Sequence, residues 1–183
     1  MALQSINIGS AANDGTGSTL RAAFDICNDN FTELYDGTGG LLHKIEGTNF
    51  TGSLLVGHST TGTISSAENN TGVGIGALDA LTTGDSNVAI GNLAGSAITT
   101  GGSNILIGRA AGDALLGGSS NVAIGHFALS AEDGHGRNIA IGKSALLNLN
   151  AGSDAYNIAI GHEAGEAMTT GTQNTIIGGL AGS

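Results

Sequence analysis

Short apolar segments recur along this chain in a fixed internal order. Each follows the pattern Asn-Φ-x-Ile-Gly, where Φ is usually Val or Ile, and Asn87-Val88-Ala89-Ile90-Gly91 is the first clear copy. The asparagines of the six clear copies are Asn87, Asn104, Asn121, Asn138, Asn157 and Asn174. Counting residues 53–57 and 72–76 as two degenerate copies, the closing glycines are spaced by 19, 15, 17, 17, 17, 19 and 17 residues. A repeat of this length predicts a solenoid, because one unit cannot bury its own faces and must stack on its neighbours.

Each unit predicts one short strand followed by one connector. Bulky Val88 and Ile90 alternate with small Ala89 and Gly91, so both faces of the strand are expected to be covered. We expect the bulky face to pack on the unit's own connector and the small face to admit a further layer. The Ala-rich connector, ending in a Thr/Gly turn, predicts a turn or two of helix. The predicted fold class is therefore a repeat solenoid, mainly parallel β, with one strand and one short helix per unit of about 17 residues.

Stacking the units in register would place the recurrent asparagines in one column. Asn side chains stacked in this way hydrogen-bond their equivalents above and below, so the six asparagines predict an Asn ladder. About eight strands at roughly 4.8 Å spacing would form a rod about 35–40 Å long. Stacked strands of this kind predict a stiff spacer.

The chain is predicted to have three parts: an N-terminal arm and helix at 1–37, a linker at 38–52 and the repeat rod at 53–183. The predicted helix begins near Ser18 or Thr19 and ends near Tyr35. Its apolar seam has spacings of four, three, four and three, formed by Leu20, Phe24, Cys27, Phe31 and Leu34. Such a seam needs a partner, either further copies of the helix or another protein. Arg21 either pairs with Asp25 or contacts that partner.

Composition and charge exclude several classes of partner. The chain has 33 Gly, no Pro, no Trp and 3% aromatic residues, so its core must rest on many small contacts. A net charge of −10 with only five Lys and Arg argues against nucleic acid and anionic membrane surfaces as partners. No apolar run approaches the roughly 18 residues of a membrane span, so no membrane insertion is expected. The N-terminus lacks a secretory pattern, which predicts synthesis in a cytoplasm.

No enzyme or cofactor site is predicted. The position after each closing glycine would form a column of mostly basic residues: His58, Arg109, His126, Lys143 and His162. This column is either a metal or polyanion strip or, as we favour, a variable solvated edge, because histidines two units apart would lie about 10 Å apart, too far to share a metal. Residues 72–76 superficially resemble a nucleotide loop but lack its Lys. We therefore expect no catalytic residues, no cofactor and no metal.

Two stretches resemble a known family. Residues 6–17, with Leu20-Arg21-Ala22-Ala23-Phe24 and residues 28–35, closely resemble an N-terminal module of tailed-bacteriophage fibre and other virion proteins. The Asn-x-Ala-Ile-Gly array resembles the repeats of phage tail fibres. It is also similar to the head repeats of trimeric autotransporter adhesins, although those units are shorter and carry two strands.

The resemblance implies a non-enzymatic virion structural protein, a tail fibre or fibre-like attachment component made in the cytoplasm of a bacterial host. It further implies a homotrimer that docks on other virion proteins by its N-terminal arm. Because repeat stacks need caps, we also expect docking through an open C-terminal rung. Two alternatives remain at this point: a host-surface adhesin that binds glycans through the rod, and a depolymerase, which lacks an evident carboxylate pair.

Overall fold

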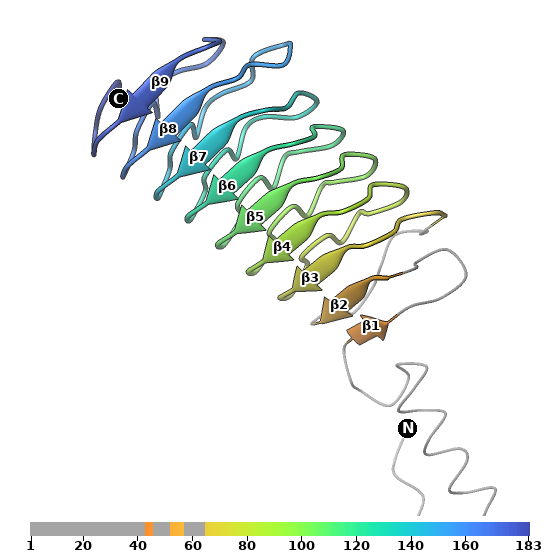
Figure 1. Ribbon diagram of the computed structural model, residues 1–183. Helices are drawn as coiled ribbons and strands as arrows, with labels where there is room; N and C mark the ends of the chain where they lie inside the picture. The colour runs from red at the N-terminus through yellow and green to blue at the C-terminus, as the bar shows by residue number, and fades with distance from the viewer. Residues whose placement is uncertain (1–42, 46–51, 57–64) are drawn as a thin grey trace, which may run out of the picture. The chain divides into compact units, whose positions relative to one another are not determined.

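Eight parallel strands, stacked in the order of the sequence, form the part of the chain that the structure describes (Figure 1). The computed structural model describes residues 43–45, 52–56 and 65–183. One sheet contains nine strands in the order β1 to β9, and β1 runs antiparallel to β2. Their bounds are β1 His43–Ile45, β2 Leu54–Val56, β3 Thr71–Val73, β4 Val88–Ile90, β5 Ile105–Ile107, β6 Val122–Ile124, β7 Ile139–Ile141, β8 Ile158–Ile160 and β9 Thr175–Ile177.

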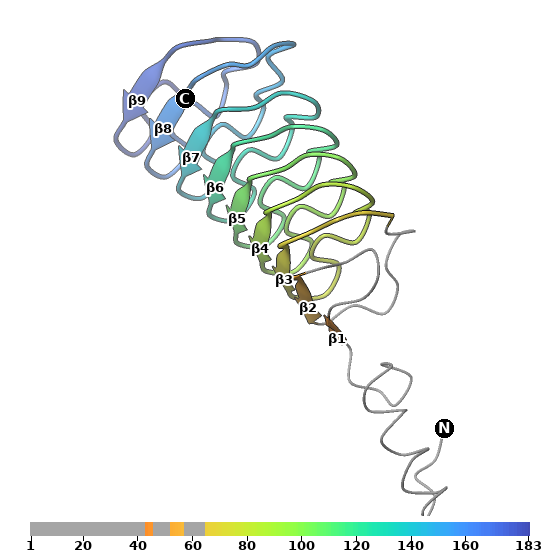
Figure 2. The ribbon, with the colours of Figure 1, turned by 45° about the vertical axis from the view of Figure 1, so that its right-hand side comes forward.

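Every strand has three residues and pairs with its neighbour without a shift. Val88 lies opposite Ile105 and Ala89 lies opposite Leu106, and the same register repeats down the stack. After each of the strands β3 to β8 the chain turns through one coil and returns to the sheet one level further along (Figure 2). Each unit therefore contributes one strand, and the predicted parallel β-solenoid is confirmed.

The third strand corrects the predicted position of one repeat. β3 is Thr71–Val73 and pairs with Val88–Ile90 in β4, so its unit begins at Asn70 and closes at Gly74. The copy predicted at 72–76 lay two residues too late, because alternating glycines there fit the pattern in two registers. With Gly74 as the closing glycine, the spacing is 17 residues everywhere except for 19 between Gly142 and Gly161.

The strands face the opposite way from the prediction. Ala89, at the centre of β4, is fully buried inside the coil, whereas Val88 is half-buried and Ile90 is 41% exposed. The same pattern of a buried centre and uncovered flanks recurs in β2 to β8. The expectation that the bulky residues pack on their own connector was wrong. The alternation of bulky and small residues shows that the two faces of the strand differ, but it does not show which face is interior. The coil is narrow, so only the central side chain of each strand, which is often small, fits between the strand and its connector.

The connectors are not helical either. Leu93 and Gly95 have φ angles of 59° and 56°, whereas a right-handed helix needs a negative φ at every residue. Alternate amides therefore make different bonds: the N–H of Ala94 donates to the carbonyl of Gly91 in the same turn, and the N–H of Leu93 donates to Ile75 on the preceding coil. The predicted short helices are consecutive turns that hydrogen-bond from coil to coil, and residues 65–183 contain no helix.

In several coils a large residue on one side of the interior faces a small residue on the other. Where the strand centre is the large Leu106, the facing connector positions are Gly95 and Gly112. A Cβ added to Gly95 would lie 2.7 Å from Cδ1 of Leu106, and one added to Gly112 would lie 2.8 Å from its Cδ2. Where the strand centre is Ala123 or Ala140, a buried leucine occupies the connector position instead. Large and small residues thus complement one another across the core of these coils.

The chain divides into two units, Met1–Leu42 and His43–Ser183, and every described residue belongs to the second. The predicted N-terminal helix and its interface residues Leu20, Arg21, Phe24, Cys27, Phe31 and Leu34 lie outside the described residues. β1 falls within the range predicted as a linker, 38–52. Among the described residues, no helix is long and apolar enough to cross a membrane.

Candidate functional site

A column of asparagines runs along the inside of the solenoid, at the residue before each strand. In every step from Asn70 to Asn174, the side-chain Oδ1 of one Asn accepts the backbone N–H of the next, at 2.9–3.2 Å. Ser53 stands at the head of the column, where its hydroxyl oxygen accepts the N–H of Asn70 at 2.8 Å. Residues Asn70, Asn87, Asn104, Asn121, Asn138 and Asn157 are buried. The sequence pattern missed Asn70 because its repeat was placed two residues late.

Five of the asparagines, Asn70, Asn87, Asn104, Asn121 and Asn157, also tie their strand to the far side of its own coil. Nδ2 of Asn87 donates to the carbonyl of Gly101 at 2.9 Å, and Nδ2 of Asn104 donates to that of Gly118 at 2.8 Å. Because these side chains are buried and their atoms are bonded within the chain, they offer no surface to a ligand. The ladder is the framework that fixes the register of the coils.

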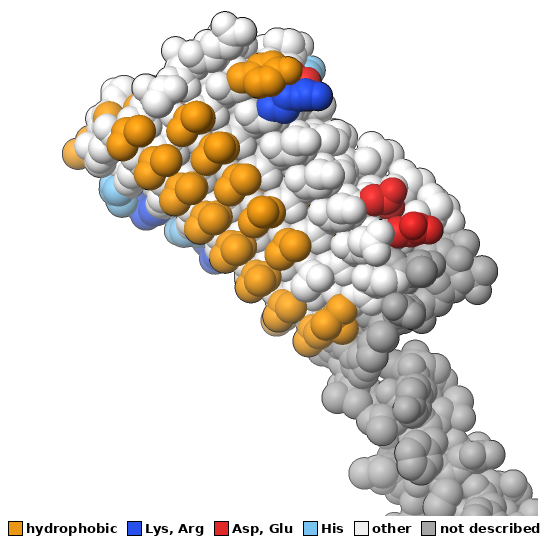
Figure 3. Space-filling view, in the orientation of Figure 1, with side chains coloured by type: hydrophobic (Ala, Val, Ile, Leu, Met, Phe, Trp, Pro, Cys, Tyr) orange, Lys and Arg blue, Asp and Glu red, His pale blue; other side chains and the backbone are white. Residues whose placement is uncertain are grey.

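An apolar face covers the outside of the sheet. We call it the sheet face and define it as the first and third residues of strands β2 to β9. These residues are Leu54, Val56, Thr71, Val73, Val88, Ile90, Ile105, Ile107, Val122, Ile124, Ile139, Ile141, Ile158, Ile160, Thr175 and Ile177. None is buried, and all but the two threonines are apolar. Figure 3 shows them as two parallel rows running along the stack.

The size of the sheet face makes it the most conspicuous surface feature of the described chain. Eight strands at roughly 4.8 Å spacing, with flanking side chains about 7 Å apart, give a patch of the order of 400 Å². Monomeric proteins seldom expose larger contiguous apolar patches, and patches of about this size are often functional. Its sixteen residues include no charged side chain. A flat β-branched surface of this kind is suited to contact with another protein surface.

A row of basic residues borders one edge of the sheet face, at the position after each closing glycine. Successive coils contribute Arg109, His126, Lys143 and His162. The guanidinium of Arg109 lies 2.8 Å from Nε2 of His126 and 5.4 Å from the ring centre of Phe127. The last two members lie near one carboxylate, since the Lys143 ammonium and Nε2 of His162 are each 3.4 Å from Glu163. These mutual contacts fit a solvated edge better than a metal site.

The opposite edge, just before the strands, carries acidic residues and one exposed aromatic. Glu68, Asp85 and Asp154 are exposed there. Asp154 accepts from the guanidinium of Arg137 at 3.1 Å, and that guanidinium lies 5.5 Å from the ring centre of Tyr156. The ring of Tyr156 is 53% exposed. The sheet face is therefore bordered by basic residues on one side and, on the other, by three acidic residues together with Arg137.

No protein-family model, no characterised protein and no solved structure matches this chain.

Proposed function

We propose that the chain is a non-enzymatic structural protein of a virion, a tail fibre or fibre-like attachment component of a bacteriophage. The observation that carries this proposal is a continuous stack of coils, each bonded to the next, that exposes one apolar face along its whole length. Such a stack is stiff, because every coil is fixed to its neighbour by strand, turn and Asn hydrogen bonds. The resemblance of residues 6–35 and of the repeats to phage fibre sequences supports the same assignment.

The proposed partner of the sheet face is another copy of this chain. The sheet face repeats with the period of the coils. When two copies lie side by side at the same level, the apolar residues of one copy therefore face apolar residues of the other along the whole stack. A face of roughly 400 Å² is only about half of the roughly 800 Å² per partner that stable interfaces bury. A closed ring in which each copy also uses both edges buries more, which favours a trimer over a face-to-face pair.

The charges on the two edges suit such a ring. In a parallel ring, the edge with Arg109 and Lys143 in one copy approaches the edge with Asp85 and Asp154 in the next copy. Opposite charges placed in this way favour one rotational order of the copies and disfavour an antiparallel arrangement. The acidic net charge of the chain, −10, disfavours association elsewhere on the surface.

Mass in solution tests the assembly directly. Light scattering on the purified full chain is expected to give three times 17.8 kDa. A mass of 17.8 kDa at micromolar concentration would contradict the trimer, and a mass twice that value would replace it with a dimer.

Incorporation into particles tests the biological role. The chain should be found by mass spectrometry in virions purified from the host that carries its gene. Deletion of residues 1–37 should abolish that incorporation, because this segment is proposed to dock on the particle. Docking through the C-terminal rung stays a prediction. Chemical cross-linking of the same virion preparations would test it, because docking should give a cross-link from the last coil to another virion protein. Virions that lack the chain altogether would overturn the proposal.

A second candidate is a host-surface adhesin that binds glycans. The exposed ring of Tyr156, beside Arg137 and Asp154, is the observation that favours it, since sugar faces stack on aromatic rings. This group occurs in one coil only, whereas the sheet face runs through all of them. Binding to a glycan array that is lost in Tyr156→Ala would favour the adhesin over the structural component.

A further inference from the structure

One coil departs from the repeat at three positions that lie together. The seventh residue after the closing glycine is a large apolar residue in the other coils, namely Leu81, Ile98, Leu115, Leu149 and Met168, but it is Glu132 in this one. The tenth residue is glycine in the other five coils, namely Gly84, Gly101, Gly118, Gly152 and Gly171, but here it is His135. The eighth residue is Thr, Leu or Asn elsewhere, and here it is Asp133. Packing does not demand these changes, because neighbouring coils of the same shape do without them.

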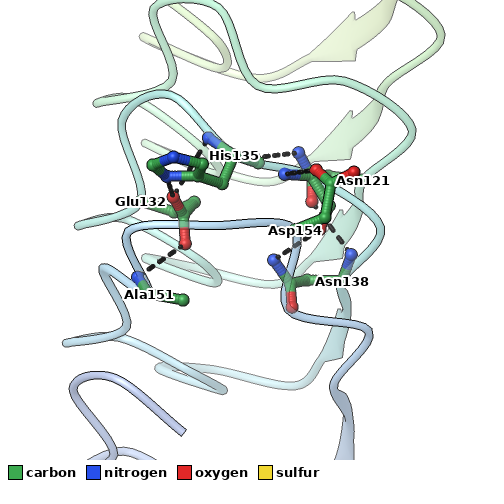
Figure 4. A network of polar contacts seen from close by, with 7 residues as sticks. Asn121, Glu132, His135, Asn138, Ala151 and Asp154 are labelled. Carbon is green, nitrogen blue, oxygen red and sulfur yellow. Dashed lines mark hydrogen bonds and ion pairs between the residues drawn. The ribbon is translucent and has the colours of Figure 1, made fainter. Parts of the chain in front are cut away.

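Glu132 is held in place by the chain around it (Figure 4). Its side chain is fully buried, in the column that leucines fill in the coils on either side. Oε2 accepts the N–H of Ala151 at 3.3 Å, and Oε1 accepts the N–H of His135 at 3.2 Å. Ala151 belongs to the only 19-residue unit between Gly57 and Gly178, whose two extra residues fall between Asn150 and Ala155. The insertion therefore supplies a donor to the buried carboxylate.

The ligand atoms of Glu132, Asp133 and His135 converge. They all lie within 4.8 Å of one another. Oε1 of Glu132 is 3.3 Å from Nδ1 of His135, which is longer than the roughly 2.7–2.9 Å of a charge-assisted hydrogen bond. Two ligands of one tetrahedral ion with bonds of about 2.0–2.2 Å lie roughly 3.3–3.5 Å apart, so this separation fits a shared metal ion. Asp133 and His135 are half-buried, which leaves the cluster open to solvent on one side.

We propose that Glu132, Asp133 and His135 form a binding site for a divalent transition-metal ion of the zinc type. A set of one imidazole and two carboxylates suits such ions, whereas Ca²⁺ takes six to eight oxygen ligands and has too few here. Three protein ligands leave one position of a tetrahedral ion to water or to a further group. The ion also compensates a buried carboxylate whose other partners are two backbone N–H groups and the imidazole of His135. This site is independent of whether the chain belongs to a virion.

The competing explanation is a buried acid that is satisfied by its hydrogen bonds alone. Under that explanation the three residues would bind no ion, and any zinc binding would come from other histidines or from Cys27. The repeat itself provides variants that separate the two cases. Glu132→Leu and His135→Gly restore the residues of neighbouring coils, so they are compatible with the fold. Asp133→Asn removes one carboxylate from a half-buried side chain and leaves the core unchanged.

The experiment is a calorimetric titration of the metal-free full chain with ZnCl₂. The wild type is expected to show one site per chain that is absent in the double variant Glu132→Leu/His135→Gly. Asp133→Asn should weaken that site by at least about tenfold. The matched control is His126→Gln/His162→Gln, which removes two other histidines and should leave the site unchanged. Titration with CaCl₂ should show no binding at the same concentrations, and zinc should raise the melting temperature of the wild type more than that of the double variant.

Several results would overturn the site. The first is that the wild type binds no zinc. The second is that the wild type, the double variant and Asp133→Asn bind zinc with equal affinity and stoichiometry. Loss of the site in the histidine control alone would assign it to the basic row instead. Far-UV circular dichroism verifies the fold of each variant, and Asp133→Asn decides the question if the double variant does not fold.

Discussion

Asn104 lies between two identical residues and bonds to both. Its Oδ1 accepts the N–H of Asn121 at 2.9 Å, and its Nδ2 donates to Oδ1 of Asn87 at 2.9 Å. Nδ2 also donates to the carbonyl of Gly118 in its own coil. One buried side chain therefore joins three levels of the stack. Because the bond from Oδ1 to the next backbone N–H repeats in every step from Asn70 to Asn174, the ladder fixes the register even though each strand has only three residues.

Replacing Asn104 by Ala should destabilise the solenoid by about 2–5 kcal/mol. The substitution leaves the buried N–H of Asn121 and the buried carbonyl of Gly118 without partners, at about 1–3 kcal/mol each. Urea unfolding monitored by circular dichroism measures the loss, and hydrogen exchange should show faster exchange of the Asn121 amide. The control is Asn92→Ala, at an exposed position, which should change stability by less than about 0.5 kcal/mol. Equal effects of the two variants would show that the ladder does not stabilise the stack.

Two effects disfavour a side chain at the closing glycines: a positive φ angle and the close approach of the next coil. Three alanine variants separate these effects. Gly108 has a φ of 134°, and a Cβ there would lie 2.6 Å from the carbonyl oxygen of Gly125 on the next coil. Gly152 has a φ of 71° but nothing within 4 Å, and Gly134 has neither a positive φ nor a neighbour. Alanine should cost about 3 kcal/mol or more at Gly108, about 1 kcal/mol at Gly152, and nothing at Gly134.

Thermal unfolding in metal-free buffer measures this series. Alanine at Gly134 should, if it has any effect, stabilise the fold by up to about 1 kcal/mol, since it reduces the freedom of the unfolded chain. If Gly108→Ala lowered the stability no more than Gly152→Ala, then the backbones of successive coils would lie further apart than the structure places them.

The sequence pattern predicts the stack well because identical residues recur at a fixed period. The parallel order of β4 to β9 follows from the six asparagines and their closing glycines. The facing of the strands does not follow, since Val88 and Ile90 alternate with Ala89 whichever side is interior. The connector is equally ambiguous: residues such as Leu93 and Ala94 favour a helix by propensity, and the left-handed φ of Leu93 is imposed by its bond to the preceding coil.

The candidate sites were harder to predict than the fold. The sheet face was taken as interior, because exposed rows of β-branched residues are unusual in a monomer. Glu132 was missed, although aligning the connectors of the six coils by their closing glycines would have shown it in a column of large apolar residues. The convergence of His135 on Glu132 could not be seen without the turn that brings their side chains together, since they lie three positions apart in the chain.

Leu106 fills the interior of its coil from the strand side, opposite Gly95 and Gly112. Leu106→Ala should cost about 2–5 kcal/mol, because Gly95 and Gly112 have no side chains that could fill the space. The matched control is Leu116→Ala, at a leucine that is 50% exposed, for which a loss below about 1 kcal/mol is expected. Chemical unfolding of both variants measures the difference. A small loss at Leu106 would mean that the coil collapses onto the cavity and that its width is not fixed.

The sheet face can be tested without disturbing the interior. Val122 and Ile124 flank the centre of β6 and point away from the buried Ala123. Val122→Glu/Ile124→Glu should leave the circular dichroism spectrum unchanged, and it should reduce the mass by light scattering from three times 17.8 kDa to 17.8 kDa. The reason is that burying two carboxylates per copy against apolar neighbours costs several kcal/mol each, which offsets most of the roughly 10 kcal/mol that an apolar contact of about 400 Å² supplies. Leu116→Glu, at an exposed connector position, is the control and should keep the wild-type mass. A double variant that remains folded and trimeric would show that the copies associate through another surface, and the apolar rows of β2 to β9 would then need a different partner.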